Sequence, residues 1–427
     1  MDLISAISTA QGKGGVAIVR MSGEGALENA KKMFSRKGEF VPNMMYPGEI
    51  DCGEFCDFGL LVYFRAPRSF TGEDVVEFHC HGGQEIARGV LRRTLALGAR
   101  PAERGEFTRR AFLNGKLSLS AAEGLADMIN AESRAQVRAG YSLYGEALTR
   151  AAEKMRAKLL SVLAELDAAL DYPEEDLAPE TNAASLPRLT ELKGELAALL
   201  KTYGAGRKIK SGVNVAICGE PNAGKSSLLN ALLGCERAIV SDIAGTTRDL
   251  VEGTLEIGGV LFRLTDTAGL REGADVLERE GVRRAEQAIR AADIIVWLKS
   301  GQRPAFPAET PVITVGAKCD LRREKGCELL VSSKTGEGLE ALKERLFEVG
   351  YGQENDGVFL LEERHFEAIK RAAQETERAA AAAEGNLPAE LVAEHVRAAW
   401  NALGELSGET ASDEIVAEIF DKFCVGK

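Results

Sequence analysis

The stretch that decides the fold runs from Val213 to Leu233 and reads VNVAICGEPNAGKSSLLNALL. It opens with an apolar run typical of a buried strand and closes with a run that favours a helix. Between them, GEPNAGKS matches the pattern of a phosphate-binding loop in the strand–loop–helix context that the pattern requires. In such a loop, backbone N–H groups and the helix N-terminus face phosphate oxygens. The stretch therefore predicts a nucleotide-binding α/β domain.

Side chains of this loop have distinct expected roles. Lys225 should reach the β- and γ-phosphates, which also makes it a catalytic candidate, and Ser226 should bind Mg²⁺ through its hydroxyl. The residues of the loop that are predicted to contact the nucleotide are Asn222, Ala223, Gly224, Lys225, Ser226 and Ser227.

Two further segments predict regions that sense the γ-phosphate. The strand at 261–265 ends in Asp266-Thr267-Ala268-Gly269, whose carboxylate would hold Mg²⁺ through its shell. The N–H of Gly269 would meet the γ-phosphate. Ahead of this strand, Gly245-Thr246-Thr247 lies in a loop whose Thr247 can close on Mg²⁺. Thr247 and Gly269 are therefore further catalytic candidates.

A third segment identifies the base. The strand at 312–315 leads to Ala317-Lys318-Cys319-Asp320. The carboxylate of Asp320 can accept hydrogen bonds from guanine N1–H and N2–H₂, a pair of donors that adenine lacks. Ser332-Ser333-Lys334 follows a later strand and is expected to close over the base. The predicted nucleotide is GTP.

The base-recognition motif is irregular, because GTPases of this class carry Asn where this chain has Ala317. Alanine can neither hydrogen-bond the base nor tie neighbouring loops together. One interpretation is a tolerated substitution that weakens guanine affinity by about 1–3 kcal/mol for the lost buried hydrogen bonds. The other is degraded base selectivity. We favour the first, because Asp320 carries most of the discrimination.

The groups needed for hydrolysis are incomplete in the sequence. Leu270 stands where Ras-like switches place a water-orienting Gln, and no arginine finger is identifiable. Because an apolar side chain cannot position water, the catalytic group must come from elsewhere. The charged segment 271–280 offers several carboxylates, most of which are expected to be solvated.

The first hundred residues predict a small α/β domain. Apolar stretches at 15–20, 59–64 and 74–78 are typical of strands. Residues 84–97 favour a helix that Gly98 closes.

The remaining sequence predicts a helical domain interrupted by the nucleotide-binding domain. Residues 120–201 and those after Glu363 are rich in Ala and Glu, as long amphipathic helices are, with Pro173 and Pro187 as punctuation. The predicted fold class is thus α/β plus all-α, with a Ras-like parallel sheet flanked by helices. The predicted domains are an N-terminal domain of residues 1–118, a discontinuous helical domain of residues 119–210 and 346–427, and an inserted G domain of residues 211–345.

The composition is that of an ordinary globular chain with a net charge of −12. No apolar run approaches the roughly 18 residues that cross a bilayer, and the N-terminus lacks signal-peptide features, so a cytoplasmic protein without membrane contact is expected. An RNA substrate would need local basic patches or a positively charged partner. The eight scattered cysteines favour reduced thiols, and Cys52 and Cys56 are expected to be structural rather than metal ligands.

Motifs outside the nucleotide site resemble one family, the bacterial MnmE (TrmE) tRNA-modification GTPases. Residues 69–74 (SFTGED), 81–83 (HGG) and 105–116 (GEFTRRAFLNGK) resemble its N-terminal domain. Residues 171–176 (DYPEED) resemble its helical domain. Residues 423–427 (FCVGK) are similar to its C-terminal signature, with Val where Ile is usual. The resemblance covers essentially the whole chain.

The resemblance implies an activity. Members of the family act with an FAD-dependent partner, MnmG (GidA), on the wobble uridine of certain tRNAs. They install an aminomethyl or carboxymethylaminomethyl group at C5 with a tetrahydrofolate one-carbon unit. The resemblance also implies a homodimer formed by the N-terminal domain, a heterotetramer with MnmG, and tRNA bound mainly through that partner.

A folate site is implied in the N-terminal domain. The cofactor would be 5-formyl- or methylene-tetrahydrofolate, and the residues implied to contact it are Arg20, Glu77, Lys116 and Lys427. Basic groups suit the glutamate tail, and a carboxylate can read the N–H donors of a pterin. The alternative for Arg20 and Glu77 is an ordinary salt bridge at a strand edge.

The resemblance also fills the catalytic gap. G domains of this family pair across their nucleotide faces and use K⁺ in place of an arginine finger. The implied potassium ligands are Asn222, Ser241, Ile243 and Thr246, and the neighbouring nucleotide contacts are Asp242, Ala244 and Gly245. Glu278 matches the family's water-orienting carboxylate.

Some alternatives stay open at this point. Cys424 is either a nucleophile or a packed thiol near the folate pocket. His79 and His81 flank Cys80, but without a third ligand they are expected to serve packing. Two other function classes share the nucleotide motifs: a regulatory or RNA-assembly GTPase switch without modification chemistry, and a nucleotide-binding scaffold with little turnover. The folate-type domain and the Cys-bearing tail favour modification.

Overall fold

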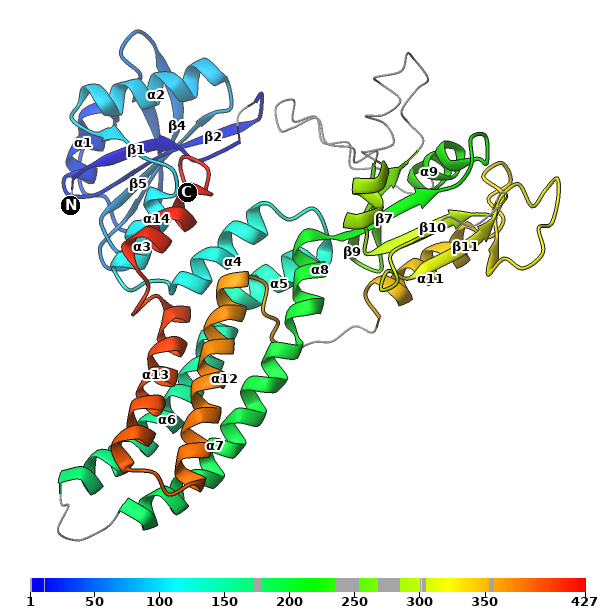
Figure 1. The fold of residues 1–427 in the computed structure, drawn as a ribbon. Helices are drawn as coiled ribbons and strands as arrows, with labels where there is room; N and C mark the ends of the chain where they lie inside the picture. The colour runs from blue at the N-terminus through cyan, green and yellow to red at the C-terminus, as the bar shows by residue number, and fades with distance from the viewer. Residues whose placement is uncertain are drawn as a thin grey trace. The chain divides into compact units, whose positions relative to one another are not determined.

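The computed structural model describes residues 2–10, 12–171, 178–234, 253–267, 285–299, 301, 305–352 and 357–427. These residues form two compact units (Figure 1). Unit 1 consists of Met1–Ala126, Ser142–Leu192 and Arg371–Lys427, and unit 2 consists of Asp127–Tyr141 and Lys193–Lys370. Across the described residues, no helix combines the length and the apolar character that a membrane span requires.

Unit 1 begins with a six-stranded sheet in the order β3-β4-β5-β2-β1-β6. Its strands are β1 (Ile4–Ile7), β2 (Val16–Ser22), β3 (Met45–Asp51), β4 (Cys56–Phe64), β5 (Val75–His81) and β6 (Arg100–Pro101). Neighbouring strands are antiparallel except for the β1–β6 pair. The helices α1 (Ala26–Met33) and α2 (Gln84–Ala96) bury one face of this sheet. On the other face, Ile4 and Ala6 pack against Phe107 of α3 (Glu106–Leu113).

Alternating side chains explain how the sheet has two covered faces. Along β2, Ala17, Val19 and Met21 are buried in the core beneath α1 and α2, while Ile18 and Arg20 point to the opposite face. A strand with this period of two places a polar residue on one face without disturbing the other. The strands predicted at 15–20, 59–64 and 74–78 and the helix predicted at 84–97 are confirmed.

Long helices make up the rest of unit 1 and part of unit 2. The chain contains α4 (Leu119–Ile129), α5 (Arg134–Tyr144), α6 (Ala147–Asp171), α7 (Ala178–Lys201), α8 (Tyr203–Ser211), α12 (Glu363–Glu384), α13 (Ala389–Ser407) and α14 (Asp413–Asp421). Within unit 1, α6 packs along α13, so helices that precede and follow the nucleotide-binding sheet in sequence lie together. The C-terminal α14 buries Ile419 and Phe420 against Leu119 of α4.

Unit 2 contains the predicted nucleotide-binding sheet, in the order β12-β11-β10-β7-β9-β8. Its strands are β7 (Val213–Cys218), β8 (Gly253–Ile257), β9 (Val260–Asp266), β10 (Ile294–Leu298), β11 (Val312–Gly316) and β12 (Leu329–Leu330). All pairs are parallel except β8–β9. The helices α9 (Lys225–Gly234) and α11 (Leu339–Gly350) contribute Leu228, Leu232, Leu342 and Leu346 to its core. The predicted fold class, α/β plus all-α, is confirmed.

Pro187 departs from the prediction that it punctuates the helices, because α7 continues through it. Proline has no N–H, so the carbonyl of Ala183 loses its hydrogen bond within the helix. Pro187 and Ala183 are exposed, so water can serve that carbonyl, while Leu189, Leu192 and Leu196 are buried on the other side of α7. Burial of these leucines keeps the segment helical.

This arrangement predicts that Pro187→Ala stabilises the protein. The substitution restores the backbone bond to Ala183, and an interior proline costs about 3 kcal/mol relative to alanine, so we expect the free energy of unfolding to rise by about 1–3 kcal/mol. Urea-induced unfolding of the full chain, followed by helical circular dichroism, measures the change. Thr190→Ala, at another exposed position of α7, is the control and should change stability far less. A loss of stability in Pro187→Ala would contradict the explanation.

Candidate functional site

The phosphate loop lies between the end of β7 and the start of α9, as the pattern requires. Two of its residues have left-handed backbone conformations, Asn222 with φ 62° and Gly224 with φ 102°. Glycine adopts this region freely, and asparagine is among the side chains that tolerate it. The loop can therefore turn its N–H groups inward ahead of the first turn of α9, where a helix N-terminus favours an anion.

Lys225 lies at the centre of this loop. Its side chain is buried, and its Nζ donates hydrogen bonds to the carbonyl oxygens of Gly219 and Glu220, each at 2.7 Å. Burial lowers the pKa of Lys225, while the charge of Asp266 acts in the opposite direction. Backbone carbonyls of the loop thus hold the ammonium group of Lys225. This is the position from which the sequence predicts contact with the phosphates.

Ser226 at the start of α9 lies beside Asp266 at the end of β9. The Oγ of Ser226 donates a hydrogen bond of 2.6 Å to Oδ2 of Asp266, and the carboxylate is buried. Thr267 is fixed to the same edge of the sheet, because its N–H and its hydroxyl both donate to the carbonyl of Ile217. A hydroxyl backed by a carboxylate is a ligand pair that suits Mg²⁺, so these residues fit the predicted ion.

The base-recognition loop is tied to the phosphate loop. Nζ of Lys318 donates to the carbonyl oxygen of Asn222 at 2.9 Å. The hydroxyl of Ser332 donates to Oδ1 of Asp320 at 2.7 Å, and Ser332 is buried. The exposed Asp320 and Lys334 and the half-buried Ser333 lie in the same loops. The structure therefore brings together the predicted phosphate and base motifs.

Ala317 is half-buried and packs against the core of unit 2. Its Cβ lies 3.9 Å from the place where a Cβ on Gly224 would be. The loops next to it are joined by Lys318 and by the Cys319 N–H, which donates to the carbonyl of Val331. These contacts tie the loops without an asparagine at position 317, although they supply no group to the base.

Several predicted site residues lie outside the described part of the chain. They are Ser241, Asp242, Ile243, Ala244, Gly245, Thr246, Thr247, Ala268, Gly269 and Glu278.

A second cluster of predicted residues lies on the N-terminal sheet. Arg20 and Glu77 are cross-strand partners on β2 and β5, and Nε of Arg20 donates to Oε1 of Glu77 at 2.8 Å. Nε2 of His79 lies 3.1 Å from Oε2 of the same carboxylate. Burial alone raises the pKa of Glu77, but the His79 hydrogen bond and the Arg20 charge outweigh it, so the pKa lies below its ordinary value.

Two aromatic rings flank the Arg20 guanidinium. Its Cζ lies 5.9 Å from the ring centroid of Phe70 and 5.6 Å from that of Phe107. Phe70 belongs to the motif at 69–74 and Phe107 to the motif at 105–116. Only the three-dimensional arrangement shows that both rings border Arg20. Lys116 is anchored beside the loop that carries Phe70, because its Nζ donates to the carbonyl of Pro67 at 3.0 Å.

The C-terminal tail packs against the same sheet. The N–H of Phe107 donates to the Lys427 carbonyl at 3.2 Å, and Val425 forms a β-bridge with Arg104. Gly426 has φ 93°, and a Cβ there would collide with the carbonyl oxygen of Ile7. The thiol of Cys424 is exposed, contrary to the interpretation as a packed thiol.

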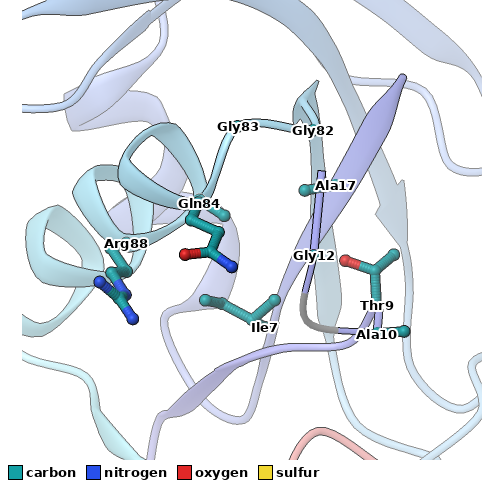
Figure 2. A pocket seen from close by; sticks show the side chains of 10 residues that line it. Ile7, Thr9, Ala10, Gly12, Ala17, Gly82, Gly83, Gln84 and Arg88 are labelled. Carbon is teal, nitrogen blue, oxygen red and sulfur yellow. The ribbon is translucent and has the colours of Figure 1, made fainter. Parts of the chain in front are cut away.

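A small cavity of ≈ 60 Å³ lies on the other face of the sheet. Figure 2 shows Gln84 and Arg88 of α2 on one side of it and Ile7, Thr9 and Ala10 on the other. Ala17 lines it and belongs to the core beneath α2, whereas Arg20 and Glu77 point away from that core. None of the predicted folate contacts lines this cavity. Among the described residues, no group of three or more His, Cys, Asp or Glu side chains is arranged to hold a metal ion.

Comparisons with known proteins match one family along the whole chain. A family model described as the N-terminus of the GTP-binding protein TrmE matches residues 3–116, and one described as the MnmE helical domain matches residues 119–424. The tRNA modification GTPase MnmE of Laribacter hongkongensis (strain HLHK9) is 41% identical over 447 residues, covering 100% of this chain and 99% of the relative. The protein of the same name from Chlorobium chlorochromatii (strain CaD3) is 39% identical over 464 residues, covering 99% and 98%.

A third relative gives the same result. The tRNA modification GTPase MnmE of Neisseria meningitidis serogroup C (strain 053442) is 42% identical over 446 residues, covering 99% of this chain and 98% of that protein. Identity of this extent spans the N-terminal sheet, the helices and the nucleotide-binding sheet together. The chain belongs to the MnmE family of tRNA modification GTPases.

Proposed function

We propose that this GTP hydrolase acts with an FAD-dependent partner, MnmG (GidA), to modify the wobble uridine of tRNA at C5. The product would be aminomethyl- or carboxymethylaminomethyl-uridine, and the carbon would come from 5-formyl- or methylene-tetrahydrofolate. Family membership favours this function over a regulatory switch without modification chemistry. The observation that supports GTP as the nucleotide is the hydrogen bond from Lys318 to the carbonyl of Asn222. This bond joins the base-recognition loop to the phosphate loop.

Residues of the phosphate loop would bind and orient the triphosphate. Backbone N–H groups of residues 222–227 would surround the phosphates, and Lys225 would exchange its bonds to Gly219 and Glu220 for phosphate oxygens. Asp320 would accept from the guanine N–H donors while Ser332 holds its other side. Thr247 and Gly269 would close on the γ-phosphate, and Glu278 would orient the attacking water.

Two cations would assist this site. Ser226, with its hydroxyl bonded to Asp266, would hold Mg²⁺ together with Thr247. Asn222 with Ser241, Ile243 and Thr246 would hold K⁺. When bound, these cations neutralise charge that develops on the phosphates. Asn222 fits this role, because its side chain is exposed and makes no hydrogen bond within the described part of the chain.

The folate would bind the sheet face that carries Arg20 and Glu77. Glu77 would offer acceptors to the pterin with Arg20 beside it, and Lys116 and Lys427 would offer positive charge to the glutamate tail. Cys424 is exposed on the tail beside this face, which is compatible with a nucleophile. We further propose a cytoplasmic homodimer formed through the N-terminal domain that joins MnmG in a heterotetramer. The net charge of −12 favours tRNA binding mainly through MnmG.

Replacing K⁺ by Na⁺ should slow GTP hydrolysis strongly, because no arginine finger is identifiable in the sequence and Asn222 would bind a monovalent cation in its place. We expect Asn222→Gly to lose most of this difference between the salts, since glycine keeps the left-handed backbone at φ 62° and removes only the side chain. Phosphate release at matched ionic strength measures both effects. Guanine nucleotide affinity of the variant, measured by calorimetry, is the control. Equal wild-type rates in the two salts would contradict the potassium proposal.

Ala317→Asn should tighten GDP binding, because the added amide can hydrogen-bond the base. The expected gain is about 1–3 kcal/mol, or about 5- to 150-fold in Kd. Titration calorimetry with GDP and ADP measures affinity and base preference together. Asp320→Asn in the same assay should lose the preference for guanine, which tests the role of the carboxylate. An unchanged GDP affinity in Ala317→Asn would contradict the prediction that an amide at this position hydrogen-bonds the base.

Gly426→Ala should weaken folate binding and leave GTP hydrolysis unchanged. A Cβ at this position collides with Ile7, and the φ of 93° disfavours alanine, so the tail that carries Cys424 and Lys427 must shift. Fluorescence titration with 5-formyl-tetrahydrofolate measures the loss, which we expect to exceed about tenfold if at least one hydrogen bond to the charged ligand is lost. Val425→Ala, at an exposed neighbour, is the control. Wild-type affinity in Gly426→Ala would exclude the tail from the site.

A further inference from the structure

The carboxylate of Glu77 is held at both oxygens. Arg20 of β2 donates to Oε1 at 2.8 Å, and Nε2 of His79 lies 3.1 Å from Oε2. Because a carboxylate oxygen accepts, this geometry assigns the Nε2 hydrogen to His79. The side chains are only partly exposed, at 12% for Glu77 and 19% for His79 and Arg20. A carboxylate that is bonded at both oxygens has one orientation. Its remaining lone pairs therefore point in fixed directions.

The register of the sheet explains why His79 can do this. Glu77 and His79 are two residues apart on β5 and therefore share a face. The cross-strand neighbours of His79 are Ile18 on β2 and Leu60 on β4. Both of these neighbours are apolar. Among the described residues, the polar side chain that the His79 ring contacts is Glu77. His79 is not part of a buried core cluster, so packing alone does not account for it.

We propose that His79 is a positioning residue that holds Oε2 of Glu77 so that the carboxylate faces the N–H donors of a pterin ring. This inference rests on the proposed folate function. His79 acts through Glu77 and need not touch the ligand. The sequence alone predicts a packing role for His79, because it does not show which carboxylate lies beside the ring.

The charges around Glu77 make the proposed effect of His79 on ligand affinity depend on pH. Arg20 on β2 and His79 on β5 lower the pKa of Glu77, and farther along the same face His81 pairs with Asp57 of β4 instead. A lowered pKa keeps the carboxylate ionised, and this state is lost as the pH falls through that pKa. Without His79 the pKa of Glu77 rises, so a ligand that needs the ionised carboxylate should lose affinity at a higher pH than in the wild type.

The experiment measures 5-formyl-tetrahydrofolate binding to the full-length protein by fluorescence titration. His79→Leu, which removes the donor, should weaken binding by about tenfold, the scale of one hydrogen bond to a charged group. His79→Gln, whose amide can still donate to Glu77, should retain most of the affinity. His81→Leu is the matched control, because it changes a histidine on the same strand and face that pairs with Asp57. GTP hydrolysis should be unchanged in all three variants.

Two further readouts separate positioning from a merely structural role. As the pH is lowered from about 7 to about 4, through the range in which carboxylates titrate, affinity should begin to fall at a higher pH in His79→Leu than in the wild type. In a double-mutant cycle, His79→Leu should have little additional effect once Glu77→Gln has removed the carboxylate, because the two residues act as a pair. Full additivity in this cycle, or a Leu variant that binds like the wild type, would overturn the inference. Failure of the wild type itself to bind the folate would overturn the proposed function instead.

Discussion

The nucleotide site depends on one constraint, that the parallel strands of unit 2 end at a common edge. Ile217 of β7 pairs with Asp266 of β9 in the ladder, so the loop that follows β7 opens beside the carboxylate that ends β9. This register is what allows Ser226 to reach Asp266 at 2.6 Å. Because side chains alternate along a strand, a slip of one residue would turn Asp266 to the other face and separate the pair. Burial of β7 and β9 in the core of unit 2 opposes such a slip.

The sequence predicts this part of the molecule well because its information is local. The phosphate loop, the strand before it and the helix after it are contiguous, and each motif stands at the end of its own strand. Alternation and composition also predict three strands of the N-terminal sheet, β2, β4 and β5, but not β1, β3 and β6. Prediction of secondary structure fails where contacts between residues distant in sequence outweigh a local propensity. Pro187 is a helix breaker by rule, yet buried leucines on the other side of α7 keep the helix continuous.

The N-terminal site could be predicted only by resemblance, because its members are distant in sequence. Strand alternation predicts which neighbours on its own strand share a face with Arg20 or with Glu77. It does not predict that the two residues are cross-strand partners, which follows from the β2–β5 register. The aromatic neighbours of Arg20 come from a loop and from α3, and the tail residue Lys427 meets Phe107 across most of the chain. No periodicity in the sequence carries such information. The sequence therefore predicts only a packing role for His79, and the contact with Glu77 is visible only in the folded sheet.

Buried charge connects the N-terminal site to its surroundings. Arg110 is 4% exposed and donates to Asp2, Glu73 and Glu106. Glu73 also accepts from Ser22, so these bonds fasten the loop that places Phe70 against Arg20. Ion pairs of this kind contribute little net stability, because desolvation offsets much of their attraction. A sheet that needed only stability would be served as well by apolar residues. The concentration of charge around Arg20 and Glu77 is consistent with the proposed folate site, since a polar ligand needs their orientation fixed before it arrives.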